Sequence, residues 1–475
     1  MSIRFDHLTF SYFEDRKPVL GEITAEFDAG EVTVLTGASG CGKSTLLYLA
    51  AGVYPHAAGV VRGGTVTVDG VEPGALSPPE RCRLVSMMFQ NPELQFCMDT
   101  VEHELIFCLE NLRTDPSDMP GRVEEALAFC GITHLKERTL LSLSGGERQK
   151  VMLSCLVLLS PKWLLLDEPF ANIDDGAARD IAAALGRLHR ERGIGILAVD
   201  HRLDNWLDVA DTVRVMDGGD LLPEGLDARA LDREKLESLG VIVPGGSYAP
   251  QLPPAHPGEV VLELRDLTLC YGETEILRGI DASFRRGCIY AVLGESGCGK
   301  SSLFSALSGV SRYGGQALLS GRELRRLGRR DLGAIGFVTQ NPQDQFVGGT
   351  VRGEIMASLR KDPQADQISE KILRSIGLWR YRDISPYLLS QGQQRRLGVA
   401  ALMAYDCKCL VCDEPTYAQD RRNTMAVMDA LCRQARERNV ALIFSTHDAQ
   451  LAADYADVIF RLEGGKLYAI TESCV

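Results

Sequence analysis

Two closely similar stretches decide the fold: GASGCGKST at residues 37–45 and GESGCGKSS at residues 294–302. Each follows an apolar run, VTVLT or IYAVL, and precedes a run of helical character, TLLYLA or SLFSAL. A strand, a glycine-rich turn and a helix in this order are the context in which GxxxxGK[ST] forms a P-loop. Glycines allow the turn that directs consecutive backbone N–H groups at a phosphate, and the helix N-terminus adds partial positive charge. The sequence therefore predicts two phosphate-binding loops.

The side chains of the two loops are suited to a nucleotide and its metal ion. Lys43 and Lys300 are predicted to neutralise the terminal phosphates, and Ser44 and Ser301 to bind Mg²⁺. The loop residues predicted to bind the nucleotide are Gly37, Ala38, Ser39, Gly40, Cys41, Gly42, Lys43, Ser44, Thr45, Gly294, Glu295, Ser296, Gly297, Cys298, Gly299, Lys300, Ser301 and Ser302.

The chain is an internal duplication. QNPELQF at residues 90–96 returns as QNPQDQF at 340–346, and the blocks LSLSGGERQK and LLLDEP return as LLSQGQQRR and LVCDEP. Lys43 and Lys300 are 257 positions apart, whereas Asp167 and Asp413 are 246 apart. An offset that changes only between motifs indicates small insertions in loops. Two copies of one domain are therefore expected.

The domain limits follow from this repeat. The first domain is predicted at 1–240 and the second at 259–475, joined by a Pro/Gly-rich linker at 241–258. We expect residues 243–258 of this linker to be exposed and semi-stiff. Alternating apolar residues at 3–10 favour antiparallel strands, and apolar strands such as 163–166 alternate with helical patterns. The predicted fold class is α/β: two tandem P-loop NTPase domains, each with a mixed or parallel core sheet, an antiparallel β subdomain and a helical subdomain, the last including 123–130.

Composition and net charge exclude several classes of protein. Of 475 residues, 45% are hydrophobic and 24% charged, which excludes global disorder, and the net charge of −13 argues against nonspecific binding to nucleic acid or anionic lipid. We expect no signal peptide and no membrane span, since the most apolar stretch, 151–166, is interrupted by polar residues and proline. The 14 cysteines are expected to be reduced thiols in the cytosol. For those at 407, 409 and 412 we favour small core residues over a metal site, because no fourth ligand is near.

Acidic and histidine side chains follow the buried strands. Asp167 and Asp413 each end an apolar strand and are predicted to hold Mg²⁺, while Glu168 and Glu414 are predicted to polarise the attacking water. His201 and His447 follow later strands and are predicted to contact the γ-phosphate. The alternatives are a solvated carboxylate at a strand end and an ordinary structural histidine. Their repetition at one offset of 246 favours the catalytic interpretation.

As a set, these motifs resemble the ATP-binding cassette (ABC) ATPases: Walker A, Gln loop, LSGGE signature, Walker B with its glutamate, and His loop occur in order, twice. The resemblance implies that Gln90 and Gln340 sense Mg²⁺ and relay to a membrane partner. It implies that Tyr12 and Tyr271 stack on adenine, with an exposed strand aromatic as the alternative. Asp174 and Asp420 match the D-loop aspartate. ATP and Mg²⁺ are the implied substrate and cofactor.

In this family the signature motif of one cassette caps ATP held by the other. The matching residues are Ser144, Gly145, Gly146, Glu147, Ser390, Gln391, Gly392 and Gln393. The first composite site would join Lys43, Glu168 and His201 with Ser390 and Gly392. The second would join Lys300, Glu414 and His447 with Ser144 and Gly146. Gln391 replaces the usual glycine and Asp200 and Arg202 flank His201, so the departures fall in the first site. We therefore expect the second site to turn over faster.

The QNPxxQF stretches resemble those of ATPases in energy-coupling factor (ECF) transporters, including cobalt- and vitamin-type systems. Phe96 and Phe346 would then contact a helix of a membrane coupling subunit, or else be core aromatics. The resemblance implies an ATP hydrolase and translocase, peripheral at the cytoplasmic face of the cell membrane, with integral coupling and substrate-binding subunits as partners and no nucleic acid. A sugar-type ABC importer is one alternative. A soluble ribosome-associated ABC ATPase is another, disfavoured by the short Pro-rich linker and the net acidic charge.

Overall fold

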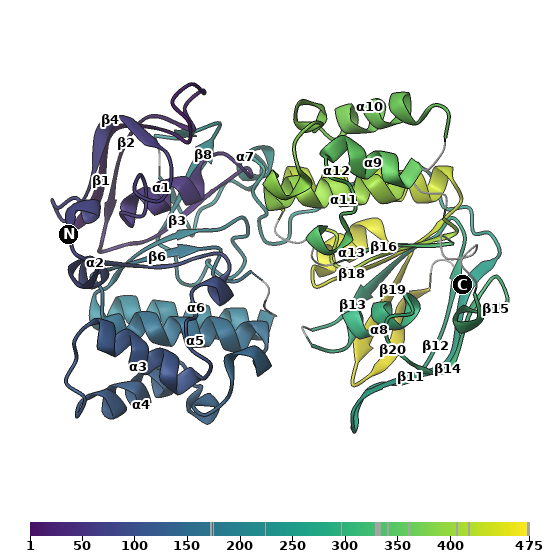
Figure 1. Cartoon of the computed structure of the whole chain (residues 1–475), viewed down its shortest axis with the longest axis horizontal. Helices are drawn as coiled ribbons and strands as arrows, with labels where there is room; N and C mark the ends of the chain where they lie inside the picture. The colour runs from purple at the N-terminus through teal and green to yellow at the C-terminus, as the bar shows by residue number, and fades with distance from the viewer. Residues whose placement is uncertain are drawn as a thin grey trace. The chain divides into compact units, whose positions relative to one another are not determined.

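The computed structural model describes residues 1–472 except 172, 174, 224, 296, 328–333, 340–341, 360–361, 405–406 and 417–418. The chain divides into two compact units, Met1–Pro244 and Gly245–Val475. Each unit has the same parts, which Figure 1 shows by label. Among the described residues, no helix has the length and apolar character needed to cross a bilayer.

The first unit opens with an antiparallel sheet of order β2-β1-β4, formed by β1 (Ser2–Ser11), β2 (Leu20–Asp28) and β4 (Val60–Val68). Ile3, Phe5, Leu8 and Phe10 of β1 are fully buried, whereas the residues between them are exposed except Thr9, which is half-buried. The alternation that predicts antiparallel strands is therefore confirmed, with one face of the sheet in the core.

The core sheet of the first unit is mixed. Its order is β10-β8-β3-β7-β6-β5, and all pairs from β8 to β5 are parallel. Its strands are β3 (Val32–Gly37), β5 (Val85–Met88), β6 (Trp163–Asp167), β7 (Gly195–Val199), β8 (Thr212–Asp217), β9 (Asp220–Leu221) and β10 (Leu226–Asp227). Because β3, β6 and β7 are neighbours, the residues that follow them meet at one edge of the sheet.

Helices cover both faces of this sheet. The antiparallel sheet and α1 lie on one side, and α5 and α6 on the other, with α3 and α4 packed on α5 (Figure 1). This last group is the predicted helical subdomain, and it includes the segment 123–130. The helices are α1 (Lys43–Ala50), α2 (Pro78–Leu84), α3 (Val101–Asn111), α4 (Met119–Phe129), α5 (Gly145–Leu159), α6 (Asp175–Arg192) and α7 (Arg233–Ser238).

The second unit repeats the plan. Its antiparallel sheet has the order β12-β11-β14-β15, and its core sheet has the order β16-β17-β18-β13-β19-β20, parallel as far as β19. The strands are β11 (Val260–Tyr271), β12 (Thr274–Arg285), β13 (Ile289–Leu293), β14 (Gly314–Leu319), β15 (Arg322–Glu323), β16 (Ile335–Val338), β17 (Cys409–Cys412), β18 (Ala441–Thr446), β19 (Val458–Glu463) and β20 (Lys466–Glu472).

The helices of the second unit are again divided between the two faces. They are α8 (Lys300–Leu307), α9 (Val351–Leu359), α10 (Ala365–Ser375), α11 (Gln391–Met403), α12 (Arg421–Glu437) and α13 (Ala449–Tyr455). Short 3₁₀ turns complete the two units: η1 (Pro73–Ala75), η2 (Pro92–Leu94), η3 (Thr133–Leu135), η4 (Leu140–Ser142), η5 (Leu324–Arg326), η6 (Pro342–Gln345), η7 (Trp379–Tyr381) and η8 (Pro386–Leu388). The predicted α/β fold class is confirmed.

Two expectations about the chain are decided by burial. Cys407 and Cys412 pack in one core cluster of the second unit and Cys409 in another, as expected of small core residues. The prediction that residues 243–258 form an exposed linker is wrong at Val243 and at Tyr248, which are 5% and 3% exposed. The reason is that these apolar side chains enter the cores of the units on either side of Pro244.

Gly195 gives a test of the core sheet. A Cβ at this position of β7 would lie 2.7 Å from the ring of the fully buried Trp163 on β6. We expect Gly195→Ala to lower the free energy of unfolding of the first unit by about 1–3 kcal/mol, because neither strand can move aside without losing its ladder. Urea unfolding followed by tryptophan fluorescence measures the change. Gly121→Ala in α4, where a Cβ meets open space, is the control and should leave stability unchanged or slightly raised. Equal effects of the two variants would contradict this packing.

Candidate functional site

The first P-loop joins the end of β3 to the start of α1 and encloses its own lysine. Lys43 is 5% exposed, and its ammonium donates to the carbonyl oxygens of Gly37 and Ala38, both at 2.9 Å. Gly37 has a φ of 140°, and a Cβ there would lie 2.0 Å from the Met216 carbonyl oxygen. Only glycine fits this turn. The loop is thus a tight cradle with one positive charge at its base.

The second P-loop has the same construction. Lys300 is 7% exposed and donates to the carbonyl oxygens of Gly294 at 2.6 Å and Glu295 at 2.8 Å. A Cβ on Gly294 would lie 2.8 Å from the Leu462 carbonyl oxygen. Ser296, also predicted in this loop, lies outside the described residues. The two predicted loops therefore share their lysine contacts and their steric requirement for glycine.

Asp167 ends β6 beside the first loop and is 2% exposed. Its carboxylate accepts hydrogen bonds from the Ser44 hydroxyl at 2.9 Å and from the Tyr48 hydroxyl at 3.3 Å. Burial raises the pKa of Asp167 to about 6, and the adjacent Glu168 carboxylate acts in the same direction. A buried carboxylate of this kind, next to a serine hydroxyl and a phosphate cradle, fits a divalent cation with oxygen ligands. Ser44 and Asp167 are the side chains that could hold it.

Glu168 is held by both of its predicted neighbours. One carboxylate oxygen accepts from the Gln90 amide at 2.8 Å, and the other lies 2.9 Å from His201 Nε2. Burial acts to raise the pKa of Glu168, but His201, Lys43 and Gln90 together outweigh it, so that the pKa lies below its ordinary value. Its backbone is left-handed, with a φ of 49°. The structure therefore brings together Gln90, Glu168 and His201 as the motifs predict.

The corresponding acidic pair of the second unit has different partners. Asp413 accepts from the Ser445 hydroxyl at 2.6 Å, and the equivalent position in the first unit is Val199. Glu414 is also left-handed, with a φ of 46°, and its carboxylate lies 3.7 Å from His447 Nδ1. The His447 side chain is 37% exposed, against 10% for His201. Gln340 lies outside the described residues. The second acidic pair is thus more open than the first.

The two predicted adenine-stacking tyrosines are exposed but sit in different surroundings. Tyr12 hydrogen-bonds Thr45 at 2.9 Å and packs edge-on against Phe10 and Tyr54. Tyr271 hydrogen-bonds Ser311 at 3.1 Å. Tyr12 therefore lies beside the first turn of α1, whereas the hydrogen-bond partner of Tyr271 follows the C-terminal end of α8.

The signature serines are helix caps. Ser144 caps α5 and exchanges backbone and side-chain hydrogen bonds with Glu147, at 2.7 and 3.3 Å. Ser390 caps α11 in the same way with Gln393, at 3.1 and 3.4 Å. In both, the helix N-terminus is available to an anion.

Gly146 of the first signature motif approaches α6, and Gly392 of the second approaches the segment just before α12. A Cβ on Gly146 would lie 2.8 Å from Ala177, and one on Gly392 would lie 3.1 Å from Gln419. Asp420 caps α12 by accepting from the Asn423 N–H at 2.8 Å. Asp174 and the side chain of Gln391 lie outside the described part of the chain.

Asp200 and Thr446, which occupy the same position before the two histidines, are both buried. The Asp200 carboxylate accepts from Trp206 Nε1 at 2.9 Å and from the Arg202 N–H at 3.0 Å, and burial raises its pKa to about 6. Thr446 instead accepts from the Asp448 N–H at 3.0 Å. The His loops therefore differ in charge immediately behind the ring.

Sequence reasoning missed one pair of buried glutamates. Glu104 of α3 accepts from the N–H groups of Cys97 and Met98, both at 2.8 Å. Glu354 of α9 accepts in the same way from Val347 and Gly348 at 2.8 and 2.6 Å. Both carboxylates fix the chain directly after QNPxxQF. Glu104 and Glu354 are 250 positions apart, as are Gln90 and Gln340. This shared offset could have identified the two glutamates from the sequence.

The two candidate aromatics of QNPxxQF are not free surface groups. Phe346 is 9% exposed and belongs to the core cluster of the α9–α11 group, so its proposed role as a helix contact is wrong and the core alternative holds. Phe96 is half-buried against the core of the first unit. In this region of the first unit, the exposed apolar side chains include Leu94, at 83%, and Met98, at 37%.

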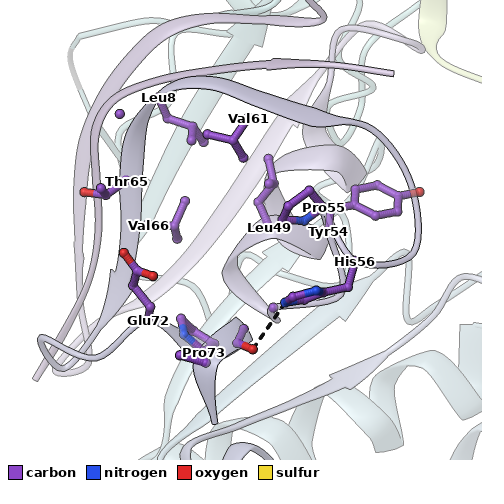
Figure 2. Close-up of a pocket in the computed structure, with 14 residues that line it drawn as sticks. Leu8, Leu49, Tyr54, Pro55, His56, Val61, Thr65, Val66, Glu72 and Pro73 are labelled. Atoms are coloured by element: carbon purple, nitrogen blue, oxygen red, sulfur yellow. Dashed lines mark hydrogen bonds between the residues drawn. The ribbon is translucent and has the colours of Figure 1, made fainter. Parts of the chain in front are cut away.

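A separate cavity of about 370 Å³ lies beside the antiparallel sheet of the first unit. Figure 2 shows Leu8, Leu49, Val61, Pro55 and other mostly apolar side chains around it. The His56 ring is hydrogen-bonded to the Gly74 carbonyl oxygen at 3.2 Å. Its lining provides no lysine or arginine and no glycine-rich turn, so its chemistry does not match a phosphate.

The comparisons with known proteins agree with this geometry. A family model described as ABC transporter matches residues 20–171 and 277–417. The chain belongs to the ABC transporter family. Its members' ATP-binding components are ATPases, so the chain is an ATP-binding hydrolase, and Mg²⁺ generally accompanies ATP in such sites. The predicted resemblance is confirmed.

Two curated relatives cover nearly the whole chain. One is provisionally named HMP/thiamine import ATP-binding protein YkoD, from Bacillus subtilis (strain 168); it is 34% identical, over 96% of this chain and 89% of the relative. Another, from Methanosarcina mazei, is provisionally named an ABC transporter ATP-binding protein; it is 29% identical, over 98% and 88%. Among solved structures, a model of ribosome-bound archaeal Pelota and ABCE1 is similar with a TM-score of 0.71 and 20% identity, over 98% and 78%. This last likeness shows the fold.

The two P-loop lysines give a direct test of the sites. We expect Lys43→Ala and Lys300→Ala each to weaken MgATP binding at one site by about tenfold or more, since hydrogen bonds from a cation to phosphate contribute roughly 1.5–3 kcal/mol each. Equilibrium dialysis should find two bound nucleotides per wild-type chain and one per single variant. Lys162→Ala and Lys408→Ala, at equivalent positions before β6 and β17, are matched controls that should retain two. Two nucleotides bound to the double Lys43/Lys300 variant would exclude these loops as the binding sites.

Proposed function

We propose that the chain is the ATP-hydrolysing subunit of an importer, bound at the cytoplasmic face of the membrane to integral subunits. The observation that carries this proposal is the complete set of P-loop, acidic pair and His-loop residues in both units, with Asp167 buried next to Ser44. The 34% identical relative named for import supports the direction of transport. The QNPxxQF stretches support an ECF-type system for a vitamin, metal or other small molecule.

The residues have distinct proposed roles at each site. Lys43 and Lys300 leave their own loop carbonyls to bind the terminal phosphates, and Ser44, Ser301, Asp167 and Asp413 hold Mg²⁺. The metal ion supplies charge neutralisation of the phosphates and a fixed template for them. Glu168 and Glu414 accept a proton from the attacking water, and His201 and His447 hold the γ-phosphate.

A groove beside the Gln loop of the first unit is the proposed docking place for a membrane subunit. It has a volume of about 500 Å³ and is lined by α2, β5, α3 and α5, with Met87, Phe107, Met152 and Leu156 among its apolar side chains. Gln95 also lines it, five residues after Gln90. Glu104 lines the groove and anchors the loop, so a helix seated there would press on the segment that positions Gln90. We propose that an apolar helix of an integral coupling subunit occupies it.

The two sites are proposed to hydrolyse ATP at different rates. Both carboxylate oxygens of Glu168 are already engaged, by Gln90 and by His201, so one contact must break before water can be activated. The Glu414 carboxylate lies 3.7 Å from His447 Nδ1, against 2.9 Å between Glu168 and His201 Nε2, and Gln340 lies outside the described residues. Together with Gln391 in the second signature, this favours slower turnover at the site of the first P-loop.

We therefore expect Glu414→Gln to reduce steady-state ATP hydrolysis more than tenfold and Glu168→Gln to reduce it about twofold, because a neutral amide cannot accept the proton of water. Phosphate release at saturating MgATP is the measurement. Glu191→Gln and Glu437→Gln, exposed and equivalent residues of α6 and α12, are controls that should keep full activity. Loss of activity in Glu168→Gln with little effect in Glu414→Gln would reverse the assignment of the faster site.

Purification from native membranes tests the class of partner. With detergent-solubilised membranes we expect the chain to copurify with integral membrane subunits, and we expect Leu94→Asp with Phe107→Asp to reduce their recovery at least fivefold while MgATP binding stays unchanged. Ile470→Asp, on the exposed surface of β20, is the control. Copurification with ribosomes and no integral subunit would favour the ribosome-associated alternative. An extracytoplasmic sugar-binding protein in the complex would favour the sugar-type importer.

A further inference from the structure

The segment on either side of Pro244 is attached at one end to the His loop of the first unit. Ile242 forms a parallel bridge with Arg202. Its N–H donates to the His201 carbonyl oxygen at 3.1 Å, and its own carbonyl accepts from the Leu203 N–H at 3.2 Å. Val241, Ile242 and Val243 are all buried. The backbone of His201 is therefore tied to this segment by a short piece of sheet.

The same segment is attached, six residues later, to the His loop of the second unit. Tyr248 is 3% exposed, and its hydroxyl donates to the Asp448 carboxylate at 3.0 Å. Its N–H and the Ser247 hydroxyl both bond the Asp454 carboxylate, at 2.7 and 3.0 Å. The Arg421 guanidinium lies 5.1 Å from the centre of the Tyr248 ring and donates to the Ser247 carbonyl oxygen. The anchor thus touches the residues next to both His447 and Asp420.

Asp448 transfers this anchor to the histidine. One of its oxygens accepts from Tyr248, and the other accepts from the Leu451 N–H at 2.9 Å, which caps α13. Its N–H donates to Thr446 at 3.0 Å. His447 therefore lies between two residues of a closed hydrogen-bonded turn. A shift of Tyr248 must displace that turn, and with it the imidazole beside Glu414.

We propose that residues 242–248 form a strap that couples the His loops of the two units, and that Tyr248 is a positioning residue for His447. The inference rests on the roles proposed above for His201 and His447. Each end of the strap is bound within one unit, and the chain between the ends is Val243, Pro244, Gly245, Gly246 and Ser247. Movement of one His loop on nucleotide binding or release then changes the tension on the other.

A simple tether would not need these contacts. A flexible connection between domains is expected to be solvated and free of buried side chains. Residues 251, 253, 254, 256 and 257, after the anchor, fit that description because they are exposed. Tyr248 differs, since it has a buried aromatic ring, a bonded hydroxyl and a cation over its face. The part of the connection up to Tyr248 is therefore anchored at each end by buried side chains and hydrogen bonds.

The length of the strap is the first quantity to test, in the full chain. Inserting Gly-Ser-Gly between Gly245 and Gly246 lengthens it while leaving both anchors intact. The matched control is the same insertion between Pro253 and Pro254, which lengthens the connection after the Tyr248 anchor. We expect cooperative ATP hydrolysis by wild type and by the control, and a Hill coefficient close to 1 for the lengthened strap. Independent sites in wild type, or identical behaviour of the two insertions, would overturn the inference.

A second readout does not depend on hydrolysis. In the Lys43→Ala chain, MgATP binds only at the second P-loop, and amide hydrogen exchange of residues 200–206 reports on the His loop of the first unit. We expect MgATP to change that exchange at least twofold, and the strap insertion, unlike the control insertion, to abolish the change. If wild type binds no MgATP at all, the proposed function fails. If wild type binds it and exchange is the same with either insertion, only the strap fails.

The hydroxyl of Tyr248 is tested by Tyr248→Phe, which retains the buried ring and its contact with Arg421. We expect kcat to fall about fivefold with KM changed less than twofold, because loss of one hydrogen bond to a carboxylate misplaces a group that acts after binding. Tyr455→Phe is the control: its hydroxyl bonds Asp429 at 2.9 Å, and its ring, which packs against Tyr248, is retained by the substitution. Equal effects of the two substitutions on kcat would contradict a positioning role for Tyr248.

Discussion

A carboxylate buried at the end of a parallel strand is costly unless hydrogen bonds or a cation compensate its charge, and both units are arranged around one. Asp167 and Asp413 each lie at the edge where the central strand turns into the P-loop. Three other groups lie close to this aspartate in each unit. They are the P-loop lysine, a hydroxyl group and the left-handed glutamate that follows the aspartate. The strand order is what brings them there, since β3, β6 and β7 are neighbours in one sheet and β13, β17 and β18 in the other.

The two units have the same fold, but different hydroxyl groups donate hydrogen bonds to the buried aspartate in each. Ser44 and Tyr48 bond the aspartate in the first unit, whereas Ser445 bonds it in the second. The position equivalent to Tyr48 is Ser305, which pairs with Ser311 at 2.6 Å. The aromatic cluster of Tyr12, Tyr48 and Tyr54 in the first unit is thus replaced by a small polar cluster in the second. Two copies of one domain whose aspartates have different hydrogen-bond partners are suited to two sites of unequal rate in one chain.

The sequence was most informative where backbone geometry requires particular residues. The P-loops could be predicted because glycine is needed at close backbone approaches such as that of Gly37 to Met216. The antiparallel strands followed from the alternation at 3–10. By contrast, the burial of Tyr248 could not be predicted, because a Pro/Gly-rich segment reads as solvated and its partners Asp448 and Arg421 are far away in sequence. Tyr48 and Ser445 were missed for the same reason: each bonds its aspartate across more than thirty positions.

Glu168 and Glu414 both adopt a left-handed backbone, with φ of 49° and 46°, in which a side chain is strained and glycine or asparagine is preferred. The strain amounts to roughly 1–2 kcal/mol at each position. Selection of this protein for heat tolerance alone would therefore favour glycine at these two positions. The resulting protein would be more stable, but it would lack the carboxylates of both glutamates.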